Sequence, residues 1–126
     1  MRGHIPRSGP LKQVAILLAI SLLLWTAASS AAAADTDEIK AMICNPAYTW
    51  DCAKAIRVAQ CESHPWLDER AYNYGQYGVF QVAYEWHSRR VNYAEELFDA
   101  AINVRVAHDI YMDNRGWTPW PTCGLR

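Results

Sequence analysis

A glutamate near the predicted end of a short helix is the residue with the clearest capacity for chemistry. Glu62 follows Val58 and Ala59 at spacings of four and three residues, so it is expected beside the apolar face of that helix. Apolar neighbours and the partial negative charge of a helix C-terminus both raise the pKa of a carboxyl group. A raised pKa suits a general acid. On position alone, a surface glutamate that ends a helix is an equal alternative.

A turn rich in glycine and aromatic residues follows this helix. Gly78-Val79-Phe80-Gln81 lies within the segment 71–84, whose Tyr, Gly, Asn and Val residues predict a short hairpin or an irregular β segment. Glycine permits tight turns and close backbone approach. A protonated carboxyl group facing such a turn, in a small exported domain, favours proton donation to the oxygen of a sugar–sugar bond.

The first 34 residues have the order of a secretory signal peptide. A basic start is followed by the apolar stretch 14–25 and by a small, Ala-rich segment that ends at Ala34. Residues 14–34 carry no charge and are long enough to span a bilayer. An uncleaved anchor is therefore the alternative, although the Ala, Ser and Thr residues of its second half insert weakly. We expect cleavage, which leaves a single domain, residues 35–126, that is secreted or extracytoplasmic and has no stable membrane association.

The charge of the exported part excludes two classes of partner. Three of the 12 Lys and Arg residues lie in the leader and none of the 13 acidic residues does, so nine basic residues remain and the net charge is −4. No basic stripe is present, which argues against nucleic acid and against binding to anionic lipid. A neutral glycan fits better, since the numerous Trp and Tyr rings of this part could stack on sugar rings as well as pack in a core.

The four cysteines all lie in the exported part, which predicts two disulfides. Cys52 and Cys61 are nine residues apart on one predicted helix, roughly 13 Å, whereas a disulfide needs Cα atoms within about 7 Å. Of the two pairings that remain, we favour Cys44–Cys52 with Cys61–Cys123. A zinc site is not expected, because the sequence has no Cys-x-x-Cys and the histidines are scattered.

Helical signals dominate the rest of the domain, which predicts an α+β fold that is mostly α. Residues 37–43 and 94–98 are expected to be short helical segments, and residues 117–123 an extended tail. A helix through residues 50–63 is predicted to be capped by Thr49 and ended by Pro65. A second helix, residues 100–114, is predicted to be capped by Asp99 and ended near Gly116. The residues expected on their buried faces are Cys52, Ala55, Ile56 and Ala59, and then Ile102, Val106, Ala107, Ile110 and Tyr111.

Four motifs occur in order along the domain, and together they resemble a known superfamily. They are Glu62-Ser63 at a helix end, the turn Gly78-Val79-Phe80-Gln81, an Asn-led helix from Asn103 to Tyr111, and Gly116-Trp117-Thr118-Pro119-Trp120 followed by Cys123. In these motifs the chain resembles the lytic transglycosylase (SLT-like) and goose-type lysozyme-like superfamily, in its small secreted single-domain branch. The Ala-Tyr-Asn found near the end of many lytic transglycosylases is replaced here by residues 117–120.

The resemblance implies a disulfide-stapled, lysozyme-like fold in which a short β-hairpin lies beside the catalytic helix. Glu62 would be the catalytic acid and base, and Gln81 would contact substrate near the cleaved bond. Ser63 would support Glu62 or cap the turn. The aromatic residues are expected either to line the groove or to pack in the core: Tyr77, Phe80, Tyr111 and Trp120. Peptidoglycan strands would be the partner of a monomer that needs no cofactor and no metal.

The chemistry that the resemblance implies is cleavage of the β-1,4 bond between N-acetylmuramic acid and N-acetylglucosamine by one glutamate. Most glycosidases need a second carboxylate. Asp68, Glu69 and Glu85 are nearby candidates, but no partner motif marks them and we expect them to be surface charges. The alternatives are a lysozyme-type hydrolase, a glycan-binding module without catalysis, and a secreted inhibitor or interaction domain in which Glu62 faces solvent.

Overall fold

Aspartate side chains begin the two longest helices of the structure. Asp51 accepts a hydrogen bond from the backbone N–H of Lys54 at 2.7 Å and begins α3 (Cys52–Ser63), while Asp99 accepts one from Ile102 at 3.0 Å and begins α5 (Ala100–Asp113). Such a bond satisfies a backbone donor that has no partner within the helix. The prediction for Asp99 is therefore confirmed. The prediction of Thr49 as a cap is wrong, because its backbone N–H and hydroxyl lie against the His108 ring instead.

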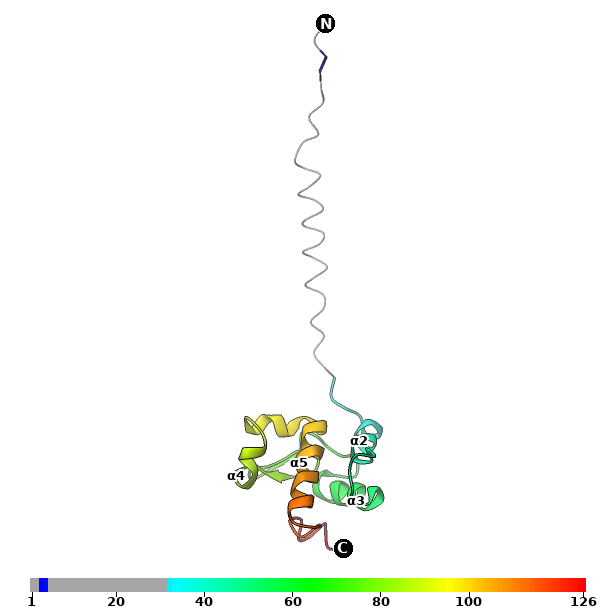
Figure 1. Cartoon of the computed structure of the whole chain (residues 1–126), viewed down its shortest axis with the longest axis vertical. Helices are drawn as coiled ribbons and strands as arrows, with labels where there is room; N and C mark the ends of the chain where they lie inside the picture. Colours follow the sequence, from blue (N-terminus) through cyan, green and yellow to red (C-terminus); the bar gives the residue numbers. More distant parts are fainter. Residues whose placement is uncertain (1–2, 5–31) are drawn as a thin grey trace. The chain divides into compact units, whose positions relative to one another are not determined.

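The computed structural model describes residues 3–4 and 32–126, of which 33–126 form one unit (Figure 1). The predicted signal peptide, residues 1–34, lies almost entirely outside the described residues, so its cleavage stays a prediction. The remaining elements are, in chain order, α2 (Thr36–Ile43), β1 (Tyr72–Asn73), β2 (Gln76–Tyr77), β3 (Val82–Ala83), α4 (Tyr84–His87), the 3-10 helix η1 (Ser88–Arg90) and the 3-10 helix η2 (Ala94–Phe98). In Figure 1, α2 and α3 lie on one side of α5 and α4 lies on the other.

The β segment is a three-stranded antiparallel sheet in the order β1-β2-β3. Tyr77 in the central strand pairs with Tyr72 on one side and with Val82 on the other. The predicted hairpin thus gains a third strand, which follows directly from the turn that contains Gln81. The short helices α4 and η1 come next; their few residues carry no helical period, so the sequence pattern did not predict them.

The core gathers around Trp50, a buried residue whose indole N–H donates to the Ile43 carbonyl at 2.9 Å. Its ring stacks on Phe80 and Trp117, with centroids 5.2 and 5.4 Å away. These contacts join α2, the β segment and the C-terminal tail in one apolar cluster. The other large side chains that are almost completely buried are Ile39, Leu67, Leu97, Ile110, Val58, Val79, Val104 and Val106.

The predicted buried faces of the two long helices are mostly correct. Ala55 and Ala59 on α3, and Val106, Ala107 and Ile110 on α5, are buried, while Ile56, Ile102 and Tyr111 are partly so. Cys52 is exposed, contrary to the prediction, because it is the first residue of α3.

Both disulfides that we favoured are present, and they exclude the other pairing. The Cα atoms of Cys44 and Cys52 are 5.0 Å apart, and those of Cys61 and Cys123 are 5.7 Å apart. The second bridge joins residues that are 62 apart in the sequence. It thereby fastens the C-terminal segment to the end of α3.

The C-terminal tail is a series of turns rather than the predicted extended segment. The backbone N–H of Trp120 donates to the Trp117 carbonyl, and that of Gly124 donates to the Trp120 carbonyl. The chain folds back here because the indole rings of the tail pack against the core and Cys123 is bound to α3. Within residues 3–4 and 32–126, no helix is long and apolar enough to cross a membrane.

Asn103 on α5 holds the β turn against the helices. Its side-chain oxygen accepts from the Phe80 N–H at 2.8 Å, and its amide group donates to the Tyr77 and Leu97 carbonyls at 2.8 and 2.9 Å. The side chain is 0% exposed, and its bonds to Phe80 and Leu97 are buried. A Cβ atom on Gly78, whose φ is +71°, would lie 2.5 Å from this amide nitrogen. Glycine is therefore required at that position.

We predict that Asn103→Ala lowers the free energy of unfolding by at least about 3 kcal/mol, because one N–H and two carbonyl groups lose buried partners at about 1–3 kcal/mol each. Urea unfolding with the disulfides intact measures this change. Asn114→Ala is the matched control, since Asn114 makes a single bond to the Ile110 carbonyl; its loss should cost about 1 kcal/mol. Equal effects of the two substitutions would show that Asn103 does not hold the turn.

Candidate active site

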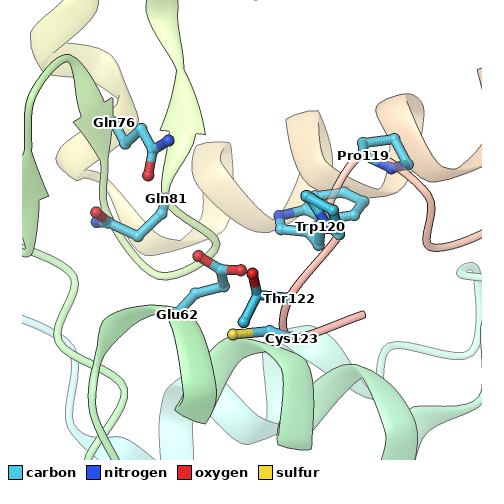
Figure 2. A pocket seen from close by; sticks show the side chains of 8 residues that line it. Glu62, Gln76, Gln81, Pro119, Trp120, Thr122 and Cys123 are labelled. Carbon is cyan, nitrogen blue, oxygen red and sulfur yellow. The ribbon is translucent and has the colours of Figure 1, made fainter. Parts of the chain in front are cut away.

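Glu62 lies in a cleft of about 300 Å³ between the end of α3, the β segment and the C-terminal tail. In Figure 2 its carboxyl group rises from α3, with Gln76 and Gln81 on the β side and Trp120 and Thr122 on the tail side. The remaining residues around the cleft are Pro119, Pro121 and Cys123. One carboxyl group thus faces side chains from two segments that are far apart in the sequence.

Burial dominates the electrostatics of Glu62. The side chain is half-buried, and burial raises the pKa of its carboxyl group above the ordinary value. In residues 32–126, neither of the two ion pairs and none of the side-chain hydrogen bonds involves this carboxylate. No positive charge therefore compensates for the lost hydration, and the protonated form that a general acid needs is favoured.

Gln81 is held in a conformation that is unusual for a residue other than glycine. Its φ is +48°, in the left-handed region, which commonly occurs at functional positions when the surroundings enforce it. The side-chain amide nitrogen donates to the Ala71 and Gly78 carbonyls, both at 3.0 Å. Because both bonds fix the nitrogen, the orientation of the amide is determined, and its oxygen keeps no partner within the described domain. That oxygen is an acceptor available to a ligand.

The tail supplies the opposite wall of the cleft. Trp120 is almost completely buried, and its indole N–H donates to the Phe80 carbonyl at 2.9 Å. This bond joins the tail directly to the turn that Asn103 holds. Cys123 is bonded to Cys61, the residue before Glu62, so the disulfide sets how closely the tail approaches the acid.

Two further cavities adjoin the cleft along the β segment. A cavity of about 70 Å³ shares Gln76, Gln81, Pro119 and Trp120 with the Glu62 cleft and extends to His87. A cavity of about 270 Å³ shares Gln76 and Ala83 with the 70 Å³ cavity and ends at Trp86. We refer to the three adjoining cavities as the groove. Burial, helped by the charge of Arg90, lowers the pKa of His87, so this ring in the middle of the groove is neutral at pH 7.

The predicted site residues fall into two groups. Gln81 and Trp120 lie beside Glu62, and Tyr77 lines the farthest cavity of the groove. Phe80 is 0% exposed, which decides between its two predicted roles in favour of packing. Tyr111 packs on Trp50 and Trp117 and does not line any of the three cavities. Ser63 is buried and donates to the Ala59 carbonyl rather than to Glu62, so it does not support the acid directly.

Several residues of the groove were not singled out in the sequence, among them Gln76, His87 and Thr122, and Tyr74 and Trp86 at its far end. Gln76 lies in the same glycine- and tyrosine-rich segment as Gln81, a signal that could have drawn attention to it. Nothing in the sequence distinguishes Thr122 from an ordinary loop residue, because only the disulfide at Cys123 brings it beside Glu62.

Other acids and metal ligands are not gathered at this site. Glu62 is the only carboxylate around its own cleft; Asp68 and Glu69 line a separate cavity near residues 33–36, and Glu85 lies at the far end of the groove. Among the residues with described positions, no cluster of His, Cys, Asp and Glu could hold a metal ion.

No family model, curated protein or solved structure gives a significant match to this chain. The functional assignment therefore depends on the chemistry and geometry of the groove.

We predict that Glu62→Gln stabilises the protein at neutral pH, with little effect in acid. A raised pKa means that the folded state holds the proton more tightly than the unfolded state. This contribution to stability is complete below the unfolded pKa, about 4.3, and is lost as pH rises through the higher folded pKa. Glutamine cannot titrate and should not show this loss.

Urea unfolding of both proteins from acid to neutral pH measures the effect. Glu95→Gln is a matched control, because Glu95 is exposed on η2 and lines none of the cavities described above. A stability difference between wild type and Glu62→Gln that stays constant with pH would show that burial does not raise the pKa of Glu62.

Proposed function

We propose that this protein cleaves the glycan strands of peptidoglycan outside the cytoplasm, as a lytic transglycosylase with a lysozyme-like fold. The observation that carries the proposal is that Glu62 is half-buried and has no ion pair, in a cleft that Gln81 and Trp120 border. The resemblance of four sequence motifs to that superfamily supports it, as does the presence of Glu62, Gln81 and Trp120, from three of those motifs, around the cleft.

The mechanism that we propose uses Glu62 first as an acid and then as a base. The protonated carboxyl group donates its proton to the oxygen between N-acetylmuramic acid and N-acetylglucosamine, and the C–O bond on the muramic acid side breaks. The N-acetyl group of the substrate shields the cationic carbon. The Glu62 carboxylate then takes the proton of the muramic acid 6-hydroxyl, whose oxygen bonds to that carbon and closes an anhydro ring. Glu62 ends protonated, and no water is consumed.

The single acid in the cleft supports this mechanism over one that uses two carboxylates. Retaining and inverting glycosidases place a second carboxylate about 5–10 Å from the first. Asp68, Glu69 and Glu85 do not border the Glu62 cleft, so they are not placed to share its chemistry. A hydrolase in which water replaces the 6-hydroxyl, and a glycan-binding module without catalysis, remain the alternatives.

An oxidising compartment outside the cytoplasm fits both the substrate and the covalent structure. All four cysteines are paired in disulfides, which persist in exported proteins. The exported domain carries a net charge of −4, which suits a neutral sugar backbone better than a polyanion. We propose that it acts as a monomer without a cofactor.

We predict that Glu62→Gln keeps the fold and lowers turnover of purified peptidoglycan by about two to four orders of magnitude, the range of acid–base catalysis. In the wild-type protein, the rate should fall on the alkaline side as Glu62 loses its proton. Circular dichroism checks the fold, and Glu95→Gln, which removes an exposed carboxylate outside the groove, should keep the wild-type rate. Turnover by Glu62→Gln at near the wild-type rate would refute the single-acid mechanism.

Mass analysis of the sugar ends separates the proposal from its alternatives. Anhydro-muramic acid ends are the expected product. Reducing ends would show that water attacks and that the protein is a hydrolase. Binding of peptidoglycan without any new ends would identify a glycan-binding module.

A further inference from the structure

Two large aromatic side chains are exposed to solvent at the end of the groove farthest from Glu62. Trp86 on α4 is 80% exposed and Tyr74, in the turn between β1 and β2, is 98% exposed. Both line the cavity of about 270 Å³ that ends the groove. Exposed apolar rings that share one concave site mark a binding surface more often than a lone exposed ring does.

Packing gives no reason for either ring to be where it is. Helix α4 has no buried residue, so Trp86 does not anchor it to the core. Tyr74 has a φ of +46°, in the left-handed region that Asn or Gly occupies at lower cost. A residue that stabilised this turn would be smaller and polar. The exposure of the two rings is therefore better explained by ligand binding than by a contribution to the stability of the fold.

The walls of this cavity indicate a neutral ligand with flat apolar faces and hydroxyl groups. Tyr77 and Tyr84 add further aromatic surface, and Gln76 and Glu85 supply polar groups at its edge. The lining includes no Lys or Arg, which argues against a phosphate or another anion. Sugar rings present such faces, which stack on the negative face of an aromatic ring, and their hydroxyl groups bond to amides and carboxylates.

The position of the cavity identifies which sugar polymer would reach it. Gln76 lines all three cavities of the groove, so the aromatic end adjoins the Glu62 cleft. A strand that is bound across Glu62 and extends past Gln76 would reach these rings.

We propose that Tyr74 and Trp86 form a second sugar-binding site, which holds a β-1,4-linked amino-sugar strand beyond Gln76 from the bond that Glu62 cleaves. This inference rests on the proposed function for the direction of the strand, but not for the binding itself. A strand long enough to contact Glu62 and both aromatic rings should bind more tightly than a short fragment that contacts only one of the two sites.

Calorimetric titration with chitohexaose and chitotriose tests the site in protein that carries Glu62→Gln, so that cleavage does not interfere. Chitohexaose should bind more tightly than chitotriose. Trp86→Ala should lower the affinity for chitohexaose about tenfold, the scale of one lost stacking contact. Tyr74→Asn should lower it severalfold, and asparagine suits the left-handed backbone, so the turn is kept.

Trp66→Ala is the matched control. Trp66 is 59% exposed and stacks on His64, but it lines a cavity near residues 33–36 that shares no residue with the groove. Its removal should change the affinity for chitohexaose less than twofold.

Three results of the chitooligosaccharide titrations would overturn the site: no detectable binding of chitohexaose, equal affinity for the two oligomers, or an unchanged affinity after Trp86→Ala. A fourth would be that Trp86→Ala abolishes binding of an isolated peptidoglycan stem peptide but leaves the affinity for chitohexaose unchanged, which would assign the rings to peptide recognition. The proposed function is tested separately. It would fail if Glu62→Gln turned over peptidoglycan at the wild-type rate, and that outcome does not depend on the titrations.

Discussion

The hydrogen bonds of one buried side chain are the constraint on which the arrangement of the groove depends. Asn103 satisfies the backbone at Phe80, Tyr77 and Leu97, and these groups would otherwise be buried without partners. The β turn is thereby fixed at one distance from α5, and Gly78 must have no side chain to come so close. Gln81 follows in the same turn, which places it at the Glu62 cleft, and its side chain is held there by bonds to the Ala71 and Gly78 carbonyls.

A covalent constraint completes the other wall. The Cys61–Cys123 disulfide closes a loop of 62 residues, for which chain entropy alone accounts for about 4 kcal/mol of stabilisation. Its position beside Glu62 matters as much as its energy, because it brings Trp120 and Thr122 to the cleft. The Trp120 indole then donates to the Phe80 carbonyl, so the two walls are joined to each other as well as to the helices.

The cleft formed in this way places a carboxyl group where burial raises its pKa. Glu62 loses hydration without gaining an ion pair, so linkage predicts that it lowers the stability of the fold at neutral pH. Carboxyl groups in such surroundings are typical of functional sites. At the aromatic end of the groove, Trp86 and Tyr74 are exposed, so they too contribute little to the stability of the fold.

The sequence by itself determined the local features: the positions of the two long helices, the Asp99 cap and Glu62 as the candidate acid. These follow from spacing and capping chemistry, which act over a few residues. The geometric limit on a disulfide excluded one cysteine pairing, and the structure decided between the two that remained. Tertiary structure decided which candidates meet. Burial removed Phe80 and Ser63 from the groove, and the folding back of the tail added Thr122. Whether a side chain faces a cleft or a core depends on contacts between distant segments, and a local pattern carries no information about those contacts.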